Sequence, residues 1–129
     1  MEIFKLIGSV MVDTADAEKM RGKRILLHFG AVDQTCRVAI NGVVVGEHEG
    51  GYLPFALDVT DAWREGENEV TVTVSDPLDE ELAYGKQRVK RGGMWYTPTS
   101  GIWQTVWMEA LPESPIERIR IDTTLASAT

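Results

Sequence analysis

The segment Glu69-Val-Thr-Val-Thr-Val-Ser75 alternates apolar and polar side chains without a break. Side chains two positions apart lie on the same face of a β-strand, so Val70, Val72 and Val74 share one face. The threonines and the serine between them point the other way. This period of two predicts a strand that is buried on one side, as is typical of an antiparallel sheet.

The same period recurs along the chain and predicts further strands at Arg24–Phe29, Thr35–Ile40, Ile102–Met108 and Ile116–Ile121. Asn41-Gly42 separates two apolar runs and indicates a hairpin, because both central residues of a type I′ turn need a positive φ. Helical signals are weak: we expect a short turn over Asp13–Met20 and one capped turn at Thr60–Trp63. Many short strands with Gly and Asn turns indicate an all-β fold, a sandwich or a barrel, of which we favour the sandwich.

Length and composition limit the functional classes. The chain has 129 residues, 43% hydrophobic and 26% charged, which fits one globular domain and excludes a (β/α)₈ barrel of about 250 residues. Thirteen basic and twenty acidic residues give a net charge of −7, which disfavours a nucleic-acid partner. The one basic cluster, in the segment 86–91, follows an acidic stretch that offsets it. Cys36 is the only cysteine, so no intrachain disulfide forms, and we expect its thiol to be buried and inert.

The sequence gives no sign of export or membrane insertion. No apolar run approaches the roughly 20 residues that span a bilayer. The first residues include Glu2 and no small-residue cleavage site, which makes them a poor signal peptide. We therefore expect no membrane partner and favour a cytoplasmic location.

The longest segment without a strand pattern runs over residues 77–100. It contains Tyr84, Trp95 and Tyr96 together with four basic side chains and three glycines. A loop of this length in a small domain is usually functional or part of an interface. We expect it to contact a ligand or a partner.

Three blocks of sequence carry a family resemblance. They are Gly22–Asp33 with Val38–Gly42, then Val45–Phe55 leading into Leu57–Asp61 and Gly66–Glu69, and finally Gly93–Trp107. Together, and in this order, they resemble the N-terminal jelly-roll domain, the sugar-binding domain, of family 2 glycoside hydrolases. That family includes β-galactosidases, β-glucuronidases and β-mannosidases. The resemblance implies an antiparallel, galactose-binding-domain-like jelly-roll sandwich.

The resemblance also divides the chain. Residues 22–111 match the jelly roll. Residues 1–21 match poorly and are expected to form at most an edge strand. Residues 112–129 are expected to be a C-terminal strand or the start of a linker to another domain.

Catalysis is not expected of this chain. Family 2 enzymes are retaining hydrolases, which need two neighbouring carboxyl groups. The resemblance places both on a catalytic barrel that follows the jelly roll and an immunoglobulin-like domain, so no glutamate here is assigned a catalytic role. We expect no cofactor and no metal, because Glu47, His48 and Glu49 are adjacent on a strand and point to opposite faces.

Five residues are candidates for contact with sugar or with a partner domain. Asp33 occupies the position of an Asn that contacts the sugar in β-galactosidases; alternatively, its carboxylate caps the turn after Phe29-Gly30. The others are in the long loop, where aromatic rings stack on sugars and cations donate hydrogen bonds: Tyr84, Arg91, Trp95 and Tyr96. Packing of these side chains within the loop is the alternative.

Two observations qualify the sugar site. Gly93 stands where β-galactosidases have a second sugar-contacting acid, which argues against galactosidase-type specificity. Trp103 and Trp107 are four residues apart and would share one face of a single strand. For this pair we favour a position in the core or in a domain interface over a sugar platform.

Three functions remain open. The favoured one is a non-catalytic carbohydrate-binding accessory domain that docks on the catalytic and immunoglobulin-like domains of a larger hydrolase. The second is an autonomous carbohydrate-binding module with a preformed aromatic site. The third is a ligand-free structural domain that forms homo-oligomers.

Overall fold

The computed structural model describes residues 3–12, 14–83, 85–90 and 92–123. The described residues form nine strands and one short helix: β1 (Ile3–Val12), α1 (Thr14–Met20), β2 (Arg24–Phe29), β3 (Val32–Asp33), β4 (Thr35–Ile40), β5 (Val43–Glu49), β6 (Phe55–Asp58), β7 (Gly66–Ser75), β8 (Gly101–Ile102) and β9 (Val106–Leu111).

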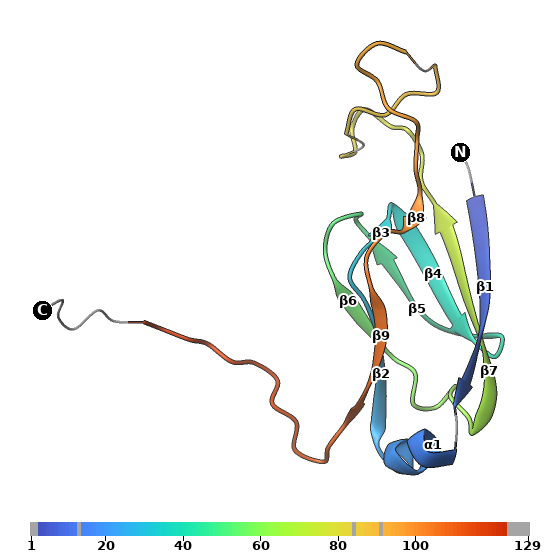
Figure 1. Ribbon diagram of the computed structural model, residues 1–129, viewed down its shortest axis with the longest axis vertical. Coiled ribbons are helices and arrows are strands. Elements are labelled where there is room, and N and C mark those ends of the chain that lie inside the picture. The colour runs from blue at the N-terminus through green and yellow to red at the C-terminus, as the bar shows by residue number, and fades with distance from the viewer. Residues whose placement is uncertain (1–2, 13, 84, 91, 124–129) are drawn as a thin grey trace, which may run out of the picture.

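Two antiparallel sheets face each other (Figure 1). One has the strand order β1-β7-β4-β5, with β1 at its edge, and the other has the order β6-β2-β9. The short strands β3 and β8 pair separately at one end. The all-β antiparallel sandwich predicted from the sequence is therefore confirmed.

The core lies between the two sheets and is built by the alternating strands. In β7, Val72 and Val74 are buried, and the register with β4 sets Val72 opposite Val38, which is also buried. The second sheet contributes Phe29, which is 1% exposed and stacks on Phe55 with ring centroids 4.9 Å apart. Burial of these apolar groups is the main stabilising contribution to such a fold.

The Asn41-Gly42 hairpin has the predicted geometry, with φ of 52° at Asn41 and 81° at Gly42. The amide group of Asn41 also donates to the side-chain oxygen of Asn68 (2.9 Å) and accepts from the amide N–H of Glu69 (3.0 Å). Asn68 is fully buried, and it also bonds to the backbone of Arg64. This polar network fixes the start of β7 beside the hairpin because each buried polar group finds a partner.

Two expected strands differ in the structure. The segment Ile102–Met108 is divided into β8 and β9, and between them Thr105 uses its carbonyl oxygen to accept from the amide of Gly30 (2.9 Å). The strand expected at Ile116–Ile121 is absent, and residues 112–123 contain neither helix nor strand. They extend away from the sandwich (Figure 1), so they have no neighbouring strand with which to pair.

The two ends of the sandwich differ in structure. The long loop over residues 77–100 forms one end, beside β3 and β8, while α1 lies at the other (Figure 1). Within the described residues, this loop contains turns and isolated bridges but no strand. Over the same part of the chain, no helix has the length and apolar character required to cross a membrane.

Candidate functional site

A small cavity of about 230 Å³ opens at the loop end of the sandwich. Its position follows from the pairing of β3 with β8, which sets Asp33 opposite Gly101. Segments far apart in the sequence therefore meet around one carboxylate. The lining residues are Asp33, Tyr52, Thr99, Ser100, Gly101 and Trp103.

Gly51 allows the cavity wall to approach the carboxylate. A Cβ atom at this position would overlap Oδ1 of Asp33, so a larger residue would displace the carboxylate. The amide of Gly50 donates to the carbonyl oxygen of Gln34 (2.8 Å), and the indole nitrogen of Trp103 donates to the carbonyl oxygen of Gly51 (2.7 Å). The double glycine thus brings two backbone segments together.

Tyr52 and Trp103 form the aromatic walls of the cavity. Their rings meet edge to face with centroids 6.0 Å apart, a favourable arrangement for aromatic pairs. The Tyr52 hydroxyl donates to the carbonyl oxygen of Ala83 (3.3 Å), which ties this wall to the long loop. Both residues remain about half exposed, at 57% and 51%, and so leave apolar surface open at the cavity.

The Asp33 carboxylate is the charged group of the cavity. Burial raises the pKa of this carboxyl group, and the nearby Asp76 raises it further. Among the residues that the structure describes, none donates a hydrogen bond to either of its oxygens. Within the described residues, no hydrogen bond therefore supports the alternative role of Asp33 as a cap of the turn after Phe29-Gly30. Both carboxylate oxygens are available to another donor.

The long loop has its own aromatic cluster. The Arg88 guanidinium lies 3.7 Å from the ring centroid of Trp95, a close cation–π contact. Tyr96 donates its amide hydrogen to the carbonyl oxygen of Lys86 (2.7 Å), and the amide of Thr99 donates to Oε1 of Gln87 (2.6 Å). These contacts join the two sides of the loop and leave the Tyr96 ring 66% exposed.

The structure separates the predicted site residues. Asp33 lines the cavity, whereas Trp95 and Tyr96 belong to the loop cluster and are not among the lining residues. Tyr84 and Arg91 lie outside the described residues. The sequence interpretation missed Tyr52 and the site position of Trp103. For both, the signal was an aromatic residue close to glycines that allow a tight approach of the backbone.

The expectation of a core position for Trp103 and Trp107 is wrong, because the two residues are 51% and 46% exposed. The alternative, a position in a domain interface, stays a prediction. Trp107 is 46% exposed on the outer face of β9, where it stacks on His28 with centroids 4.8 Å apart. The imidazole of His28 is also 3.1 Å from the carboxylate of Glu109. Because the break between β8 and β9 changes the direction of the chain, Trp103 instead reaches the cavity.

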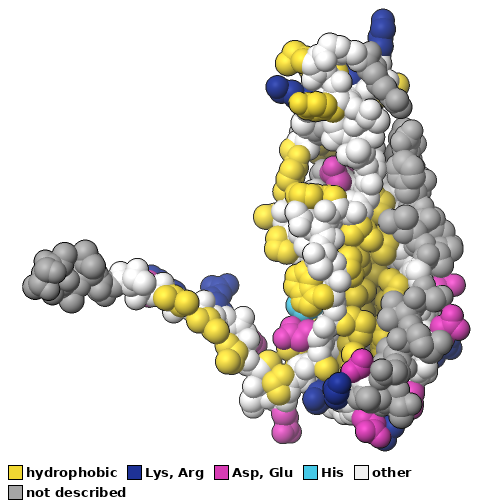
Figure 2. Space-filling model, in the orientation of Figure 1, with side chains coloured by type: hydrophobic (Ala, Val, Ile, Leu, Met, Phe, Trp, Pro, Cys, Tyr) yellow, Lys and Arg dark blue, Asp and Glu magenta, His cyan; other side chains and the backbone are white. Residues whose placement is uncertain are grey.

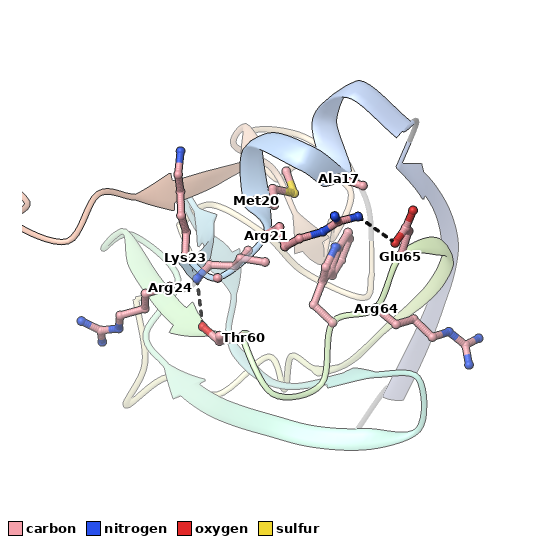
Figure 3. Close-up of a pocket in the computed structure, with 11 residues that line it drawn as sticks. Ala17, Met20, Arg21, Lys23, Arg24, Thr60, Arg64 and Glu65 are labelled. Atoms are coloured by element: carbon pink, nitrogen blue, oxygen red, sulfur yellow. Dashed lines mark hydrogen bonds and ion pairs between the residues drawn. The ribbon is translucent and has the colours of Figure 1, made fainter.

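A second hollow, of about 460 Å³, lies at the opposite end, between α1 and the segment that precedes β7 (Figure 3). Met20, Ile25 and Trp63 contribute its apolar lining. In Figure 3 the charged ends of Lys23, Arg24 and Arg64 point outward in different directions. Arg21 faces Glu65 across 3.7 Å. These charged groups do not converge on one point, so the Asp33 cavity is the better candidate for specific recognition.

The other side chains with reactive groups, Cys36, His48 and Glu47, make contacts within the fold. Burial raises the pKa of the Cys36 thiol, which makes it a poor nucleophile. His48 lies opposite Cys36 and stacks on Phe55 with centroids 4.0 Å apart. Glu47 is paired with Arg37 at 2.6 Å. Within the described ranges, no three His, Cys, Asp or Glu side chains form a group that could hold a metal ion.

Comparison with known families gives a match over most of the chain. Residues 10–104 match the family described as glycosyl hydrolase 2 galactose-binding domain-like. The matched region includes every residue that lines the Asp33 cavity.

Similar proteins are much longer than this chain. The β-galactosidase of Thermoanaerobacter pseudethanolicus is 32% identical over 104 residues, which cover 79% of this chain and 13% of that protein. The β-galactosidase of Thermoanaerobacterium thermosulfurigenes is 30% identical, with coverage of 83% and 14%. A solved β-glucuronidase from Ruminococcus gnavus, in complex with uronic deoxynojirimycin, superposes with a TM-score of 0.66 at 28% identity, covering 86% of this chain and 20% of that one.

Proposed function

This chain belongs to the glycosyl hydrolase 2 galactose-binding domain-like family, and from this premise we propose that it is a non-catalytic accessory domain. In this role it supplies one wall of a sugar site that the catalytic domain of a larger glycoside hydrolase completes. The domain itself carries out no bond cleavage.

The observation that carries this proposal is that the Asp33 carboxylate lines the same cavity as two half-exposed aromatic residues, Tyr52 and Trp103. A carboxylate accepts hydrogen bonds from sugar hydroxyls, and aromatic faces pack against the apolar faces of pyranose rings. Tyr52 and Trp103 are held by hydrogen bonds to the backbone, so this arrangement exists before a ligand arrives. Preorganised groups of this kind reduce the entropic cost of binding.

The size of the cavity favours an accessory domain over an autonomous binding module. Its volume of about 230 Å³ is below the roughly 300–1,000 Å³ of ordinary ligand pockets. A sugar bound here would therefore keep much of its surface exposed unless a second domain covered it. We expect the isolated chain to bind free sugars only weakly.

Exposed apolar groups supply a surface on which the remainder of the enzyme can dock. Figure 2 shows hydrophobic side chains gathered along the side of the body that carries β9. Trp107 on the outer face of this strand is 46% exposed, and the neighbouring Val106, which points to the other face, is 40% exposed at the edge of the sheet. Contiguous apolar surface often marks an interface. We propose residues 22–111 as the jelly roll and 112–129 as the connection toward the immunoglobulin-like and catalytic domains.

A domain exchange tests the proposal. Residues 3–111, which include every described strand of the sandwich, replace the corresponding N-terminal domain of the Thermoanaerobacter pseudethanolicus β-galactosidase, and kcat/KM is measured on 4-nitrophenyl β-galactoside. We expect Asp33→Ala to lower kcat/KM about tenfold, the effect of losing about 1.4 kcal/mol of binding. The matched control is Asp61→Ala, an exposed acid in the turn after β6.

The possible results of this exchange distinguish a sugar-facing Asp33 from one that has no such role. A loss confined to Asp33→Ala supports a sugar-facing role for this end of the sandwich. Equal kcat/KM values for the unmodified exchange, Asp33→Ala and Asp61→Ala would contradict the role. Thermal unfolding of each exchanged protein identifies variants that lose activity only because they fail to fold.

A further inference from the structure

We propose that the hollow between α1 and the segment before β7 binds an acidic peptide segment that carries one bulky apolar side chain (Figure 3). The hollow and the Asp33 cavity lie at opposite ends of the sandwich (Figure 1). This role is therefore separate from sugar binding and does not depend on it. Two features support it: an apolar lining that is held in place by the backbone, and a rim on which positive charge exceeds negative charge.

The apolar lining of the hollow is fixed before a ligand arrives. Ile25 is 5% exposed, and Met20 and Trp63 are half-buried. The amide of Ile25 donates to Oγ1 of Thr60 (2.9 Å), and the amide of Trp63 donates to the carbonyl oxygen of Val59 (2.9 Å). The volume of about 460 Å³ falls within the roughly 300–1,000 Å³ of ordinary ligand pockets. A bulky apolar side chain can therefore enter at a small ordering cost to the protein.

The rim of the hollow is basic, although the chain as a whole is acidic. Four of the thirteen basic residues line the hollow, together with one acid, Glu65. Arg24 is neutralised by Asp58 at 2.6 Å. Arg21 faces Glu65 at 3.7 Å, and the side chains of this pair are 69% and 64% exposed, so their attraction is weak in water.

The other two cations of the rim, Lys23 and Arg64, are not neutralised. Both are exposed, and neither forms an ion pair with another residue that the structure describes. Nε of Arg64 donates to the carbonyl oxygen of Glu67 (3.1 Å), which orients the guanidinium group but leaves its charge. In Figure 3 the two side chains extend to different sides of the hollow. One small anion would meet at most one of them, whereas carboxylates at several positions along a peptide can meet both.

The same features favour a peptide over other polyanions. The net charge of −7 repels a nucleic-acid backbone that extends beyond the hollow. Binding to a lipid surface requires apolar side chains that insert into it, whereas the apolar side chains of this site line a hollow. In an acidic peptide, the apolar side chain fills the hollow and the flanking carboxylates approach Lys23 and Arg64. Charge complementarity of this kind gives an interface its specificity.

The test measures binding of the fluorescein-labelled peptide Asp-Glu-Phe-Glu-Asp to the 129-residue chain at pH 7 by fluorescence anisotropy. Lys23→Glu and Arg64→Glu should each weaken binding at least fivefold, because repulsion replaces attraction. Arg118→Glu makes the same change of charge on the segment that follows β9 and should leave binding unchanged. Raising NaCl from about 50 mM to about 500 mM should also weaken binding, because salt screens exposed charges. Thermal unfolding of each variant shows whether it is folded.

Two further peptides separate the apolar contribution from the charged one. Asp-Glu-Ala-Glu-Asp and Asn-Gln-Phe-Gln-Asn should each bind at least fivefold more weakly than the first peptide. Equal binding of either peptide, or equal binding by folded Lys23→Glu, Arg64→Glu and Arg118→Glu chains, would overturn the proposal.

Other occupants of the hollow would also be detected. An oligothymidylate or a phosphatidylserine vesicle that binds more tightly than the first peptide, and loses affinity in Arg64→Glu, would overturn the proposal in favour of a different polyanion. Self-association of the unmodified chain in analytical ultracentrifugation, abolished by Arg64→Glu, would overturn it in favour of a second copy of the chain. Neither result would alter the sugar-binding role proposed for the opposite end.

Discussion

The indole nitrogen of Trp103 donates a 2.7 Å hydrogen bond to the carbonyl oxygen of Gly51, a residue 52 positions earlier in the chain. This bond joins the segment after β8 to the turn before β6. Gly51 also borders Asp33. The shape of the cavity therefore depends on a contact between two distant parts of the sequence.

Trp103→Phe removes this hydrogen bond but keeps an aromatic wall. A typical net contribution of one hydrogen bond predicts a decrease of about 1 kcal/mol in the free energy of unfolding, measured by urea denaturation. The kcat/KM of the exchanged β-galactosidase should fall as well. Trp107→Phe is the control, since the described residues offer no acceptor to its indole nitrogen. Equal behaviour of the two variants would argue against a structural role for the Trp103 bond.

Gly51→Ala should displace the Asp33 carboxylate, because the added methyl group overlaps its oxygen. We expect kcat/KM of the exchanged β-galactosidase on 4-nitrophenyl β-galactoside to fall at least fivefold. Gly8→Ala is the control, because nothing lies within 4 Å of the Cβ it would add. An unchanged kcat/KM in Gly51→Ala would show that the position of this carboxylate does not matter for the sugar site.

Trp95→Ala tests the long loop in the exchanged enzyme. Removal of the ring leaves Arg88 without its cation–π partner and deletes apolar surface beside the exposed Tyr96. We expect a KM several times higher, with kcat changed less, if this cluster faces the sugar or the catalytic domain. A variant with unaltered kinetics and unaltered domain association would assign Trp95 to packing of the loop alone.

The Asp58 carboxylate links stability to pH. Its pKa is lowered from 3.8 to about 2, first by the hydroxyl of Thr60, then by the Arg24 guanidinium and the Thr60 amide. A lowered folded-state pKa contributes stability above the unfolded value, and this contribution disappears as the pH falls from about 4 toward 2. The Asp58 side chain is 45% exposed, so after solvent screening we expect at most about 1 kcal/mol.

Urea denaturation of Asp58→Asn between pH 7 and pH 3 measures this effect. The variant should be less stable than the unmodified chain at pH 7, and the difference should shrink as the pH approaches 3. For Asp61→Asn, the difference in stability from the unmodified chain should not shrink as the pH falls. A difference independent of pH would rule out an electrostatic origin for the contribution of Asp58.

Local patterns predicted the parts of the fold that depend on neighbouring residues. The alternation in Glu69–Ser75 gave β7, and Asn41-Gly42 gave the hairpin between β4 and β5. A strand pattern alone cannot supply a pairing partner. The isoleucine-rich segment 116–121 consequently remains outside the sheets despite its alternation.

The candidate site was less accessible to sequence reasoning because its parts are distant in the chain. Asp33 was identified from its place in the first sequence block. Tyr52 and Trp103 join it only through the pairing of β3 with β8 and the bond to Gly51. A continuous strand over Ile102–Met108 would have turned Trp103 to the same face as Trp107, and the break after Ile102 prevents this.

The most direct test of the central claim, that this domain helps to hold sugar but does not cleave it, is the release of 4-nitrophenol by the purified 129-residue chain. On 4-nitrophenyl β-galactoside and β-glucuronide, we expect rates equal to those of buffer at every chain concentration. The claim would be contradicted by a rate of release that rises in proportion to chain concentration, if this activity also co-elutes with the chain during size-exclusion chromatography.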